Sequence, residues 1–523
     1  MRFHFLIYIM KIRKIILSLC GLSAFAAPVT AGGLLTNTNQ NIAFLRNPAR
    51  DAAIGIDGVY SNPAGLTFLK PGWHISLNIQ SAYQTRTAES FFQAGNVTPL
   101  AMGEGNAADG WKKYEGRAKA PVIPSIQLAW VGKRWALSGG FAITGGGGKC
   151  TFDDGLGSFE SQVAMLPVLL NGLVQQQPGM SGVNLIDGYR ADMYMKGRQY
   201  YYGMQLGVGY RITPQLSAHV GGRLVLADCN YYGYVRNIQL HTAPAAAALG
   251  LPQGYVPAGQ LMEGMGYPHF ASLVADRALD CNQSGWTFMP VVSVNYKLPR
   301  WNFAARYEFK GRMHLKNQSN NTSGVAEFDD GQKVWAEIPA LLTLGVSYDV
   351  LPNLRASVGY HYFFDRQAAQ YEHREKKLKS GTQEFLAGLE YDINKRITVS
   401  AGYQSTNYGL GSNSEFLSDM SFVTSSNSVG LGAAFQLTPT ISMNVAYFKT
   451  FYKTYTKHHD DFNHIKSTLS GSMQALVGSG QLTANELQAA ATLGAMLPQL
   501  NTEGTDHFHR TNDVFGVNLN FDF

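Results

Sequence analysis

The chain of 523 residues has only 15% charged residues but 12% aromatic ones, with 56 glycines and 27 tyrosines. Lys and Arg number 42 against 36 Asp and Glu, but four of the basic residues lie within positions 1–31, and the remaining 38 against 36 gives no reason to expect nucleic acid binding. No apolar run beyond the N-terminal region is long enough for a membrane-spanning helix, so the composition favours β structure with aromatic girdles.

The N-terminus has the pattern of a secretory signal. Three basic residues at positions 11–14 precede the apolar residues 15–25, and small residues surround Ala31. We therefore expect residues 1–31 to be a signal peptide. Of the three cysteines that remain, Cys229 and Cys281 bracket one long loop, and we expect these two to form a disulfide in an oxidising compartment.

Residues 51–71 form an irregular, mostly uncharged segment ahead of the first strand pattern. Gly55, Gly58, Pro63 and Gly65 oppose a long helix or a central strand, yet the segment is too apolar for a solvated linker. Asn62 can cap a turn with its side chain while Pro63 fixes the backbone. We expect residues 32–72 to pack inside a larger structure, although Asn-Pro could also mark an ordinary turn.

A period-two alternation of apolar and polar residues follows and recurs to the C-terminus, which predicts strands with one apolar and one polar face. About fourteen such strands are expected, an even number suited to closure into a barrel. Their ranges are 73–80, 122–131, 135–143, 202–210, 216–226, 286–296, 301–309, 338–348, 354–364, 385–391, 397–403, 429–435, 441–447 and 515–523.

The connections alternate between tight turns and long loops, as in outer-membrane barrels. Trp and Tyr residues, such as Trp73, Trp135, Tyr210 and Trp286, stand near strand ends where a membrane interface is expected. A large soluble β-sandwich would not need aromatic residues at both ends of its strands. Residues 73–523 are therefore predicted to form an all-β transmembrane barrel, whose lumen would stay open unless the preceding segment plugged it.

Charged residues fall on the polar, inward face of several predicted strands. We expect ion pairs that brace the lumen, which is a commoner role for such residues than transport. The residues are Arg223, Arg306, Glu308, Lys310, Arg355, Glu384 and Glu390.

The segment with Asn62, Pro63, Ala64 and Gly65 just before the first strand resembles the N-terminal region of the FadL/TodX family of outer-membrane fatty-acid and hydrocarbon transporters. The alternating strands and the aromatic C-terminus at 518–523 are similar as well. The resemblance implies a fourteen-stranded barrel with an N-terminal hatch and sideways release of a hydrophobic cargo. An earlier Asn47-Pro48-Ala49 lacks the following Gly-Leu and is not matched to the family motif.

Glycines interrupt the third predicted strand. Gly139 and Gly140 lie in its middle, and glycine within a strand marks a bulge or a close approach. We expect a kink at these two residues that opens the barrel wall. The alternative is that they make room for the hatch.

Two long loops carry apolar residues and are expected to capture the cargo, since exposed apolar surfaces either pack together or bind apolar ligands. Mutual packing of the two loops is the equal alternative. The residues are Val163, Leu166, Leu169, Leu170 and Leu173 at helical spacing in one loop, and Met262, Met265, Phe270 and Leu273 in the other.

Imidazole and carboxylate side chains occur at both ends of the last long loop, where the chain must return to adjacent strands. Such groups could hold a cation, although solvated residues are the commoner outcome and no metal is assigned. They are His458, His459, Asp460, Asp506, His507 and His509.

The sequence thus predicts a monomeric, passive transporter in the outer membrane of a Gram-negative bacterium, without cofactor or enzymatic activity. Its partners would be a hydrophobic small molecule and the surrounding lipid and lipopolysaccharide. The basic residues 373–379 could contact lipopolysaccharide phosphates, although a solvated charge run is the commoner role of such a segment. Two alternatives are a structural or adhesive barrel and an outer-membrane lipid hydrolase using a histidine such as His74 or His219.

Overall fold

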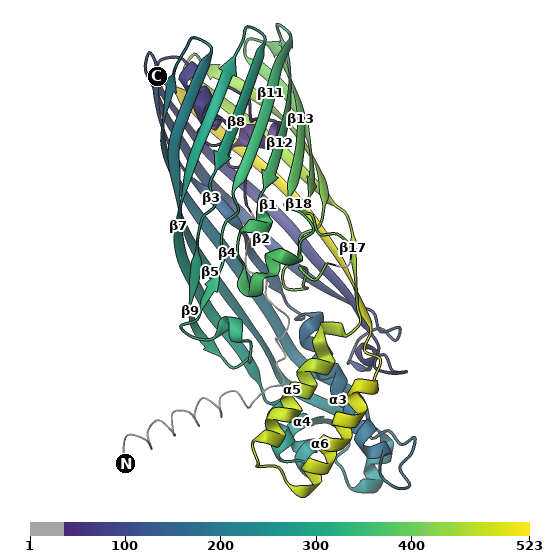
Figure 1. Ribbon diagram of the computed structural model, residues 1–523. Coiled ribbons are helices and arrows are strands. Elements are labelled where there is room, and N and C mark those ends of the chain that lie inside the picture. Colours follow the sequence, from purple (N-terminus) through teal and green to yellow (C-terminus); the bar gives the residue numbers. More distant parts are fainter. Residues whose placement is uncertain (1–35, 413) are drawn as a thin grey trace, which may run out of the picture.

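The computed structural model describes residues 36–412 and 414–523, and the expected signal peptide lies outside them. Its main feature is one antiparallel sheet closed into a barrel (Figure 1). Closure occurs because β1 (Gly72–Phe92) pairs with β2 (Lys112–Val131) on one side and with β18 (Gly504–Asp522) on the other. The predicted all-β barrel is confirmed.

Fourteen strands form the wall. The described residues contain eighteen strands, but β6 and β17 only extend the loop ends of neighbouring strands, and two wall strands are interrupted, so that β8 with β9 and β10 with β11 each count once. The remaining strands are β3 (Trp135–Phe152), β4 (Ile186–Arg211), β5 (Leu216–Thr242), β6 (Gly254–Pro257), β7 (Arg277–Lys297), β8 (Trp301–Glu308), β9 (His314–Asn321), β10 (Lys333–Trp335), β11 (Leu341–Leu351), β12 (Leu354–Phe363), β13 (Gln383–Asn394), β14 (Ile397–Asn407), β15 (Ser426–Thr438), β16 (Ile441–Tyr452) and β17 (Tyr455–His459).

Each predicted strand is present, and the ends at the short turns were placed well. The ends at the long loops extend further than expected: the first strand was predicted over 73–80 and runs over Gly72–Phe92. Alternation of residue type fades above the apolar band because both faces of the extended sheet then meet polar surroundings or loops. The strand continues there through backbone hydrogen bonds.

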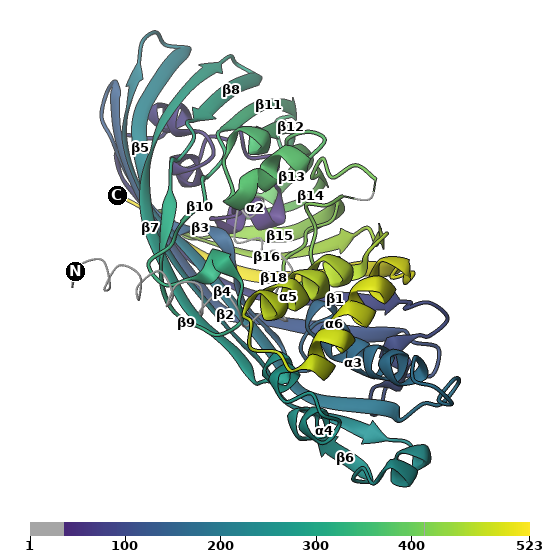
Figure 2. The ribbon, with the colours of Figure 1, turned by 60° about the horizontal axis from the view of Figure 1, so that its bottom comes forward.

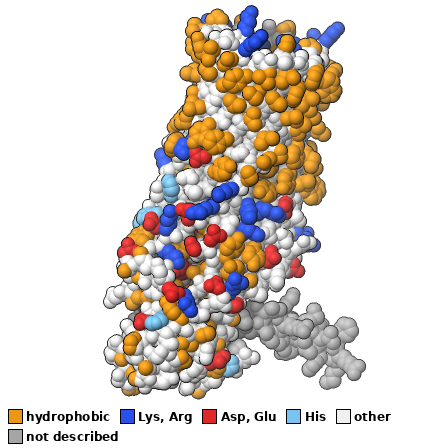
Figure 3. All heavy atoms as spheres, turned by 180° about the vertical axis from the view of Figure 1, so that it is seen from behind, with side chains coloured by type: hydrophobic (Ala, Val, Ile, Leu, Met, Phe, Trp, Pro, Cys, Tyr) orange, Lys and Arg blue, Asp and Glu red, His pale blue; other side chains and the backbone are white. Residues whose placement is uncertain are grey.

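The outer face of the wall is apolar over the half that lies near the short turns (Figure 3). Trp73, Trp135 and Trp286 have 55%, 53% and 66% of their surface exposed there. Such exposure of large apolar side chains is typical of a face that meets lipid, with aromatic residues at its borders. Among the described residues, no helix combines the length and apolar character needed to cross a membrane.

Helices cover the long-loop end of the barrel (Figure 2). Residues from four α-helices contribute to one extensive buried apolar cluster together with the extended strand ends. Thr483 closes a capping box with Glu486 at the start of α6. The helices are α3 (Gly157–Gln175), α4 (Ala258–Gly264), α5 (Ile465–Gly478) and α6 (Ala484–Met496), with short 3₁₀ helices η3 (Pro99–Met102), η4 (Pro244–Leu249), η5 (His269–Val274), η6 (Ala326–Phe328), η7 (Asp365–Gln367), η8 (Tyr371–Lys377), η9 (Phe462–His464) and η10 (Leu497–Gln499).

The segment before β1 lies within the barrel, against the inner faces of strands on both sides of the β1–β18 seam (Figure 2). It contains α2 (Ile42–Arg46), η1 (Ile56–Val59) and η2 (Pro63–Phe68). Nearly all residues from 40 to 52 and from 57 to 67 are buried. We call residues 36–71 the plug.

Candidate functional site

The wall has a gap between β2 and β3. The two strands pair near the short turn up to Ile126 opposite Phe141, and pair again only beyond the gap, at Arg117 opposite Thr151 and Gly116 opposite Phe152. Residues 118–125 and 142–150 therefore leave facing backbone edges without mutual pairing. Gly146 and Gly148 have φ of +90° and +68°, a left-handed conformation that favours glycine, and the β3–β4 register shifts here as well.

The kink expected at Gly139 and Gly140 is wrong, because both residues pair on both sides. Gly139 lies opposite Leu128 and Leu206, and Gly140 opposite Gln127 and Gln205. A Cβ on Gly140 would lie 3.2 Å from Cγ1 of Val59 in the plug. Gly140 therefore makes room for the plug, which was the alternative explanation of these glycines. The gap in the wall begins two residues further along β3, at residue 142.

The first described residues of the plug lie along the free edge of β3. Thr36 bridges to Gly145, and the Asn37 backbone amide donates to the Thr144 carbonyl at 2.9 Å. The Asn37 side chain amide donates to the Ile143 carbonyl at 3.0 Å. The plug thereby satisfies backbone acceptors that the missing β2 pairing would otherwise leave open.

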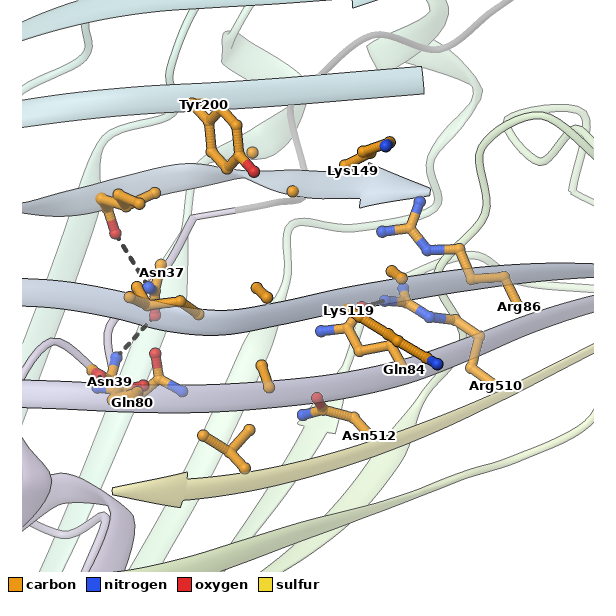
Figure 4. Close-up of a pocket in the computed structure, with 18 of the residues that line it drawn as sticks. Asn37, Asn39, Gln80, Gln84, Arg86, Lys119, Lys149, Tyr200, Arg510 and Asn512 are labelled. Carbon is orange, nitrogen blue, oxygen red and sulfur yellow. Dashed lines mark hydrogen bonds between the residues drawn. The ribbon is translucent and has the colours of Figure 1, made fainter. Parts of the chain in front are cut away.

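A cavity of about 200 Å³ lies inside the barrel behind this gap (Figure 4). Its wall combines apolar and polar groups: alanine, isoleucine and valine side chains stand beside Arg86, Arg510 and three tyrosines. The lining comes from both edges of the gap, from the plug, from β1, β4, β16 and β18, and from Tyr408 just after β14. It includes Asn37, Asn39, Gln84, Arg86, Ala118, Ile123, Ile143, Tyr200, Tyr408, Tyr452, Arg510 and Val514, and the exposed Lys119 and Lys149 stand at its outer rim, on the two edges of the gap.

Two arginines give the cavity a positive end. Arg86 on β1 lies directly opposite Arg510 on β18, and both side chains extend toward the cavity (Figure 4). Arg86 is 7% exposed and Arg510 5%. Arg510 donates to the Phe422 carbonyl at 3.1 Å and to Gln84 at 3.4 Å, and its guanidinium lies over the Tyr452 ring. Two like charges opposite each other in a ladder repel, so an anion between them would be stabilised.

The predicted turn at Asn62 is present in the plug. The Asn62 side chain accepts from the Gly65 amide at 3.2 Å and donates to Asn295 on β7 at 2.8 Å. The Ala64 amide donates to Ser293 at 3.0 Å, and the Ala64 carbonyl accepts from Ser217. The motif therefore fastens the plug to β5 and β7.

The earlier Asn47-Pro48-Ala49 is as deeply packed as the matched motif. Asn47 is fully buried and accepts from the Ala49 amide at 3.1 Å. A Cβ on Gly388 of β13 would overlap the Asn47 side chain, and one on Gly402 of β14 would overlap Pro48. The sequence analysis did not select this motif, but it packs closely against Gly388 and Gly402 of the wall.

Buried ion pairs join the plug to β12 and β13. Arg46 and Arg50 contact Glu390 at 2.8 Å and 3.2 Å, and Arg50 also contacts Asp57 at 2.7 Å within the plug. Nearby, His361 stands between Asp51 of the plug at 2.9 Å and Glu384 at 2.7 Å. Removing one member of such a set would leave a buried charge, so the contacts position the plug strongly.

The expected ion pairs of the lumen are confirmed. Glu308 contacts both Arg306 and Arg223, the latter at 2.7 Å, and both guanidinium groups lie over the Tyr60 ring of the plug, at 4.5 Å and 4.8 Å from its centroid. Lys310 contacts Glu337 at 2.7 Å, and Arg355 contacts Asp392 at 2.6 Å.

The apolar loop residues expected to capture the cargo pack against one another instead of lining the cavity. The five residues of α3 and Met262, Phe270 and Leu273 belong to one buried cluster, and Met265 packs against it. None of these residues lines the cavity behind the gap. The alternative of mutual packing describes this arrangement.

The expected disulfide is absent, since Cys229 and Cys281 are free and buried. They lie on adjacent strands but two residues out of register, because Cys229 faces Gln283 while Cys281 faces Tyr231. Diagonal neighbours in a ladder are about 7–8 Å apart, too far for the short Cβ separation that a disulfide requires.

The two ends of the last loop meet, as expected, in the β17–β18 ladder. His459 contacts Asp506 at 2.9 Å, while His507 stacks on Trp111. Within the described ranges, no group of three or more His, Cys, Asp or Glu side chains is placed to hold a metal ion. His458, Asp460 and His509 therefore join no such group.

Neither histidine considered for a hydrolase has the arrangement of a catalytic site. His219 Nε2 is 3.5 Å from Ser138 Oγ, but its Nδ1 has no hydrogen-bond partner among the described residues, so no carboxylate orients the ring. His74 contacts Asp522 and the Lys70 carbonyl near the short-turn end.

The basic segment 373–379, expected to meet lipopolysaccharide or solvent, is partly internal. Arg374 contacts Glu327 at 2.8 Å, and both residues are buried.

Sequence reasoning missed Arg86 and Arg510. The first strand was predicted to end at position 80 and the last to begin at 515, so neither arginine lay on a predicted strand. The signal available was the return of polar residues at even positions of β1 after Ala82, at Gln84 and Arg86.

Comparison with known proteins gives a likeness in structure without one in sequence. No protein-family model and no curated protein sequence matches the chain. A FadL homologue from Pseudomonas aeruginosa has a similar structure, with a TM-score of 0.57 and 12% identity over 94% of this chain and 100% of that one. The chain therefore shares the fold of that protein.

Two further solved structures align over most of their length with lower scores. The toluene transporter TodX of P. putida gives a TM-score of 0.46 at 14% identity, covering 90% of this chain and 94% of that one. The toluene transporter TbuX of Ralstonia pickettii gives 0.45 at 13%, covering 91% and 98%.

Proposed function

We propose that this protein is an outer-membrane transporter that takes up hydrophobic small molecules and releases them sideways into the membrane. The observation that carries the proposal is the cavity behind the β2–β3 gap, because a chamber inside the barrel here adjoins a break in the lipid-facing wall. An apolar exterior and a closed fourteen-stranded wall support placement in an outer membrane.

The chemistry of the cavity favours an amphiphile with an acidic head over a neutral hydrocarbon. Arg86 and Arg510 would hold a carboxylate, as guanidinium groups do in bidentate pairs. The alanine, isoleucine and valine side chains would take the first part of an acyl chain, at about 0.8 kcal/mol for each buried methylene. A long-chain fatty acid combines these two features.

The plug acts as the gate in this proposal. Its residues Thr36 and Asn37 lie along the free edge of β3 and line the cavity, so their displacement would join the chamber to the lipid. The ion pairs of Arg46, Arg50 and Asp51 hold the rest of the plug, which confines the required movement to the first few described residues.

A reversible crosslink tests the gate. Thr36 and Gly145 form a bridge pair, so a T36C/G145C variant should form a disulfide that keeps the plug across the gap. We expect cells with the oxidised variant to lose uptake of radiolabelled oleate and to regain it after reduction. The single variants T36C and G145C serve as controls for the substitutions. Equal uptake by the oxidised and reduced forms would contradict lateral release.

A further inference from the structure

Basic side chains gather on the outer face of β2, β3 and β4. Along β4, the outward residues from the short turn are Tyr210, Val208, Leu206, Met204 and Tyr202, followed by Tyr200, Arg198 and Lys196. Arg198 lies opposite Lys149 on β3, and Lys196 lies opposite Thr151, whose other neighbour is Arg117 on β2. We call Arg117, Lys119, Lys149, Lys196 and Arg198 the basic row.

The basic row stands just beyond the apolar band of the wall. Twelve residues separate Tyr210 from Arg198 on β4. At about 3.3 Å per residue and a tilt of about 40°, this spans roughly 30 Å along the barrel axis, against an apolar band about 25 Å tall. Figure 3 shows Lys and Arg side chains bordering the hydrophobic surface on the rear face. The row is thus level with the head groups of the outer leaflet.

Three lysines of the row have no acidic partner. Arg198 contacts Asp228 at 2.9 Å, and Arg117 contacts Glu115 at 2.8 Å. In contrast, Lys119, Lys149 and Lys196 form no ion pair within 4.0 Å anywhere in the described part of the chain, and Lys119 and Lys149 are exposed. Lys119 and Lys149 also stand on opposite edges of the gap. Three cations without carboxylates at one level fit an anionic head group.

Tyrosines continue the surface beyond the lysines, away from the membrane. Tyr194 and Tyr234 stack with ring centroids 5.7 Å apart, and the Arg236 guanidinium lies 4.0 Å from the Tyr234 ring. Lys196 lies 5.4 Å from the ring of Tyr232. Partly exposed aromatic rings give sugar rings a flat apolar surface to pack on, and the flanking cations supply hydrogen-bond donors.

We propose that this face binds a phosphorylated glycolipid of the outer leaflet, with the phosphates on Lys119, Lys149 and Lys196 and the attached sugars over the tyrosines. The occupant is the lipid A part of lipopolysaccharide, because its acyl chains would follow the apolar band below the lysines. The inference rests on the outer-membrane placement in the proposed function, but not on the cargo or the gate. A lipid held at Lys119 and Lys149 would border the lateral gap.

Binding of purified lipid to the full-length mature protein tests this inference. The K119Q/K149Q/K196Q variant is compared with K70Q/K133Q/K395Q, which removes the same charge from exposed lysines near the short turns. Native mass spectrometry in detergent measures binding of bisphosphorylated lipid A, dephosphorylated lipid A and inorganic phosphate. We expect about fivefold weaker lipid A binding for each lysine removed, hence roughly a hundredfold for the triple variant, and no change for the control.

The three ligands separate binding of a lipid-linked phosphate from binding of free phosphate. A separate uptake measurement distinguishes this inference from the proposed transport function. Equal binding of phosphorylated and dephosphorylated lipid A by the wild type, or unchanged binding by the triple variant, would overturn the inference. Inorganic phosphate that binds as tightly as lipid A would also overturn it, since the site would then recognise a free anion. Oleate uptake is measured separately, so a protein that transports oleate but does not retain lipid A refutes only this inference.

Discussion

Arg86 and Arg510 face each other across the β1–β18 ladder, on the inner side of the seam where the first and last strands close the barrel. Both are almost fully buried, yet they are alike in charge. If the cavity binds cargo as proposed, their position beside apolar side chains and next to the gap should favour one end of an elongated amphiphile.

Charge selectivity is expected to depend on these arginines. In R86Q and R510Q variants, oleate affinity should fall roughly 10- to 150-fold, because a hydrogen bond to a charged group contributes about 1.5–3 kcal/mol. Methyl oleate, which lacks the carboxylate, should bind the variants and the wild type alike. Calorimetric titration in detergent measures both ligands, with the exposed Arg134→Gln as the control. Equal losses for the acid and the ester would mean that the arginines only support the wall.

The close fit between wall glycines and the plug predicts a leaking pore in Gly388→Ala. The added methyl group would overlap the Asn47 side chain, so the chain following α2 must move. Planar-bilayer conductance and sensitivity of cells to a large hydrophilic antibiotic should both rise. The matched control is Gly197→Ala on β4, where a Cβ would lie 3.7 Å from the Tyr231 ring, an ordinary contact. Unchanged conductance and antibiotic sensitivity in Gly388→Ala would show that the plug accommodates the added methyl group without opening the pore.

Local stability of the plug should depend on Asn62. Asn62→Ala removes the cap of η2 and the bond to Asn295, at a cost of about 1–3 kcal/mol. Hydrogen exchange followed by mass spectrometry should show faster exchange over residues 62–69 while β7 stays protected. Asn62→Asp keeps the acceptor for the Gly65 amide and should lie between Ala and the wild type. Unchanged exchange rates in both variants would show that contacts other than those of Asn62 stabilise η2.

The loop that follows β12 should lose stability as pH rises. Burial raises the pKa of Asp365 in η7 to about 7, although the Thr382 amide donates to its carboxylate. The folded loop therefore binds a proton that the unfolded loop, with an ordinary pKa near 4, has lost, so the free energy of unfolding falls between about pH 4 and pH 7.

Limited proteolysis of this loop measures the effect. Cleavage should accelerate from pH 5 to pH 7.5 in the wild type after correction for the protease's own pH profile. Asp365→Asn, which keeps an acceptor for the Thr382 amide, should remove most of that dependence. Asp460→Asn, an exposed carboxylate in the last loop, is the control. If cleavage of Asp365→Asn depends on pH as strongly as cleavage of the wild type, another titrating group causes the effect.

The barrel wall was predictable because alternation along each strand reports directly which face meets lipid. The ends of the strands at the long loops were not, since above the membrane residues such as Gln84 and Arg86 no longer contrast with an apolar face. The gap depends on a register shift between two strands, and Gly139 and Gly140 mark only where a side chain is missing. Whether the wall has a gap at a strand depends on how that strand pairs with both of its neighbours. A single sequence does not specify this pairing.

The plug was predictable as a buried segment, but only one of its two Asn-Pro-Ala turns was selected. What distinguishes a packed turn from a free one is the opposing surface, here Gly388 and Gly402 on strands far along the chain. The apolar loops show the same limit. Leu166 and Met262 lie in one cluster because two loops distant in sequence converge, and their composition alone fitted ligand capture equally well.

The plug also has a consequence for how the chain matures. Asn41 contacts Ser76 on β1 and Asn518 on β18, and a Cβ on Gly516 would overlap Ile42. The two strands that are joined last thus share a template that precedes both in the chain. We therefore expect closure of the seam and docking of α2 to be coupled, so that a chain with a misplaced N-terminal segment assembles more slowly. Residues Asn41 and Ile42 would then serve barrel closure as well as packing within the lumen.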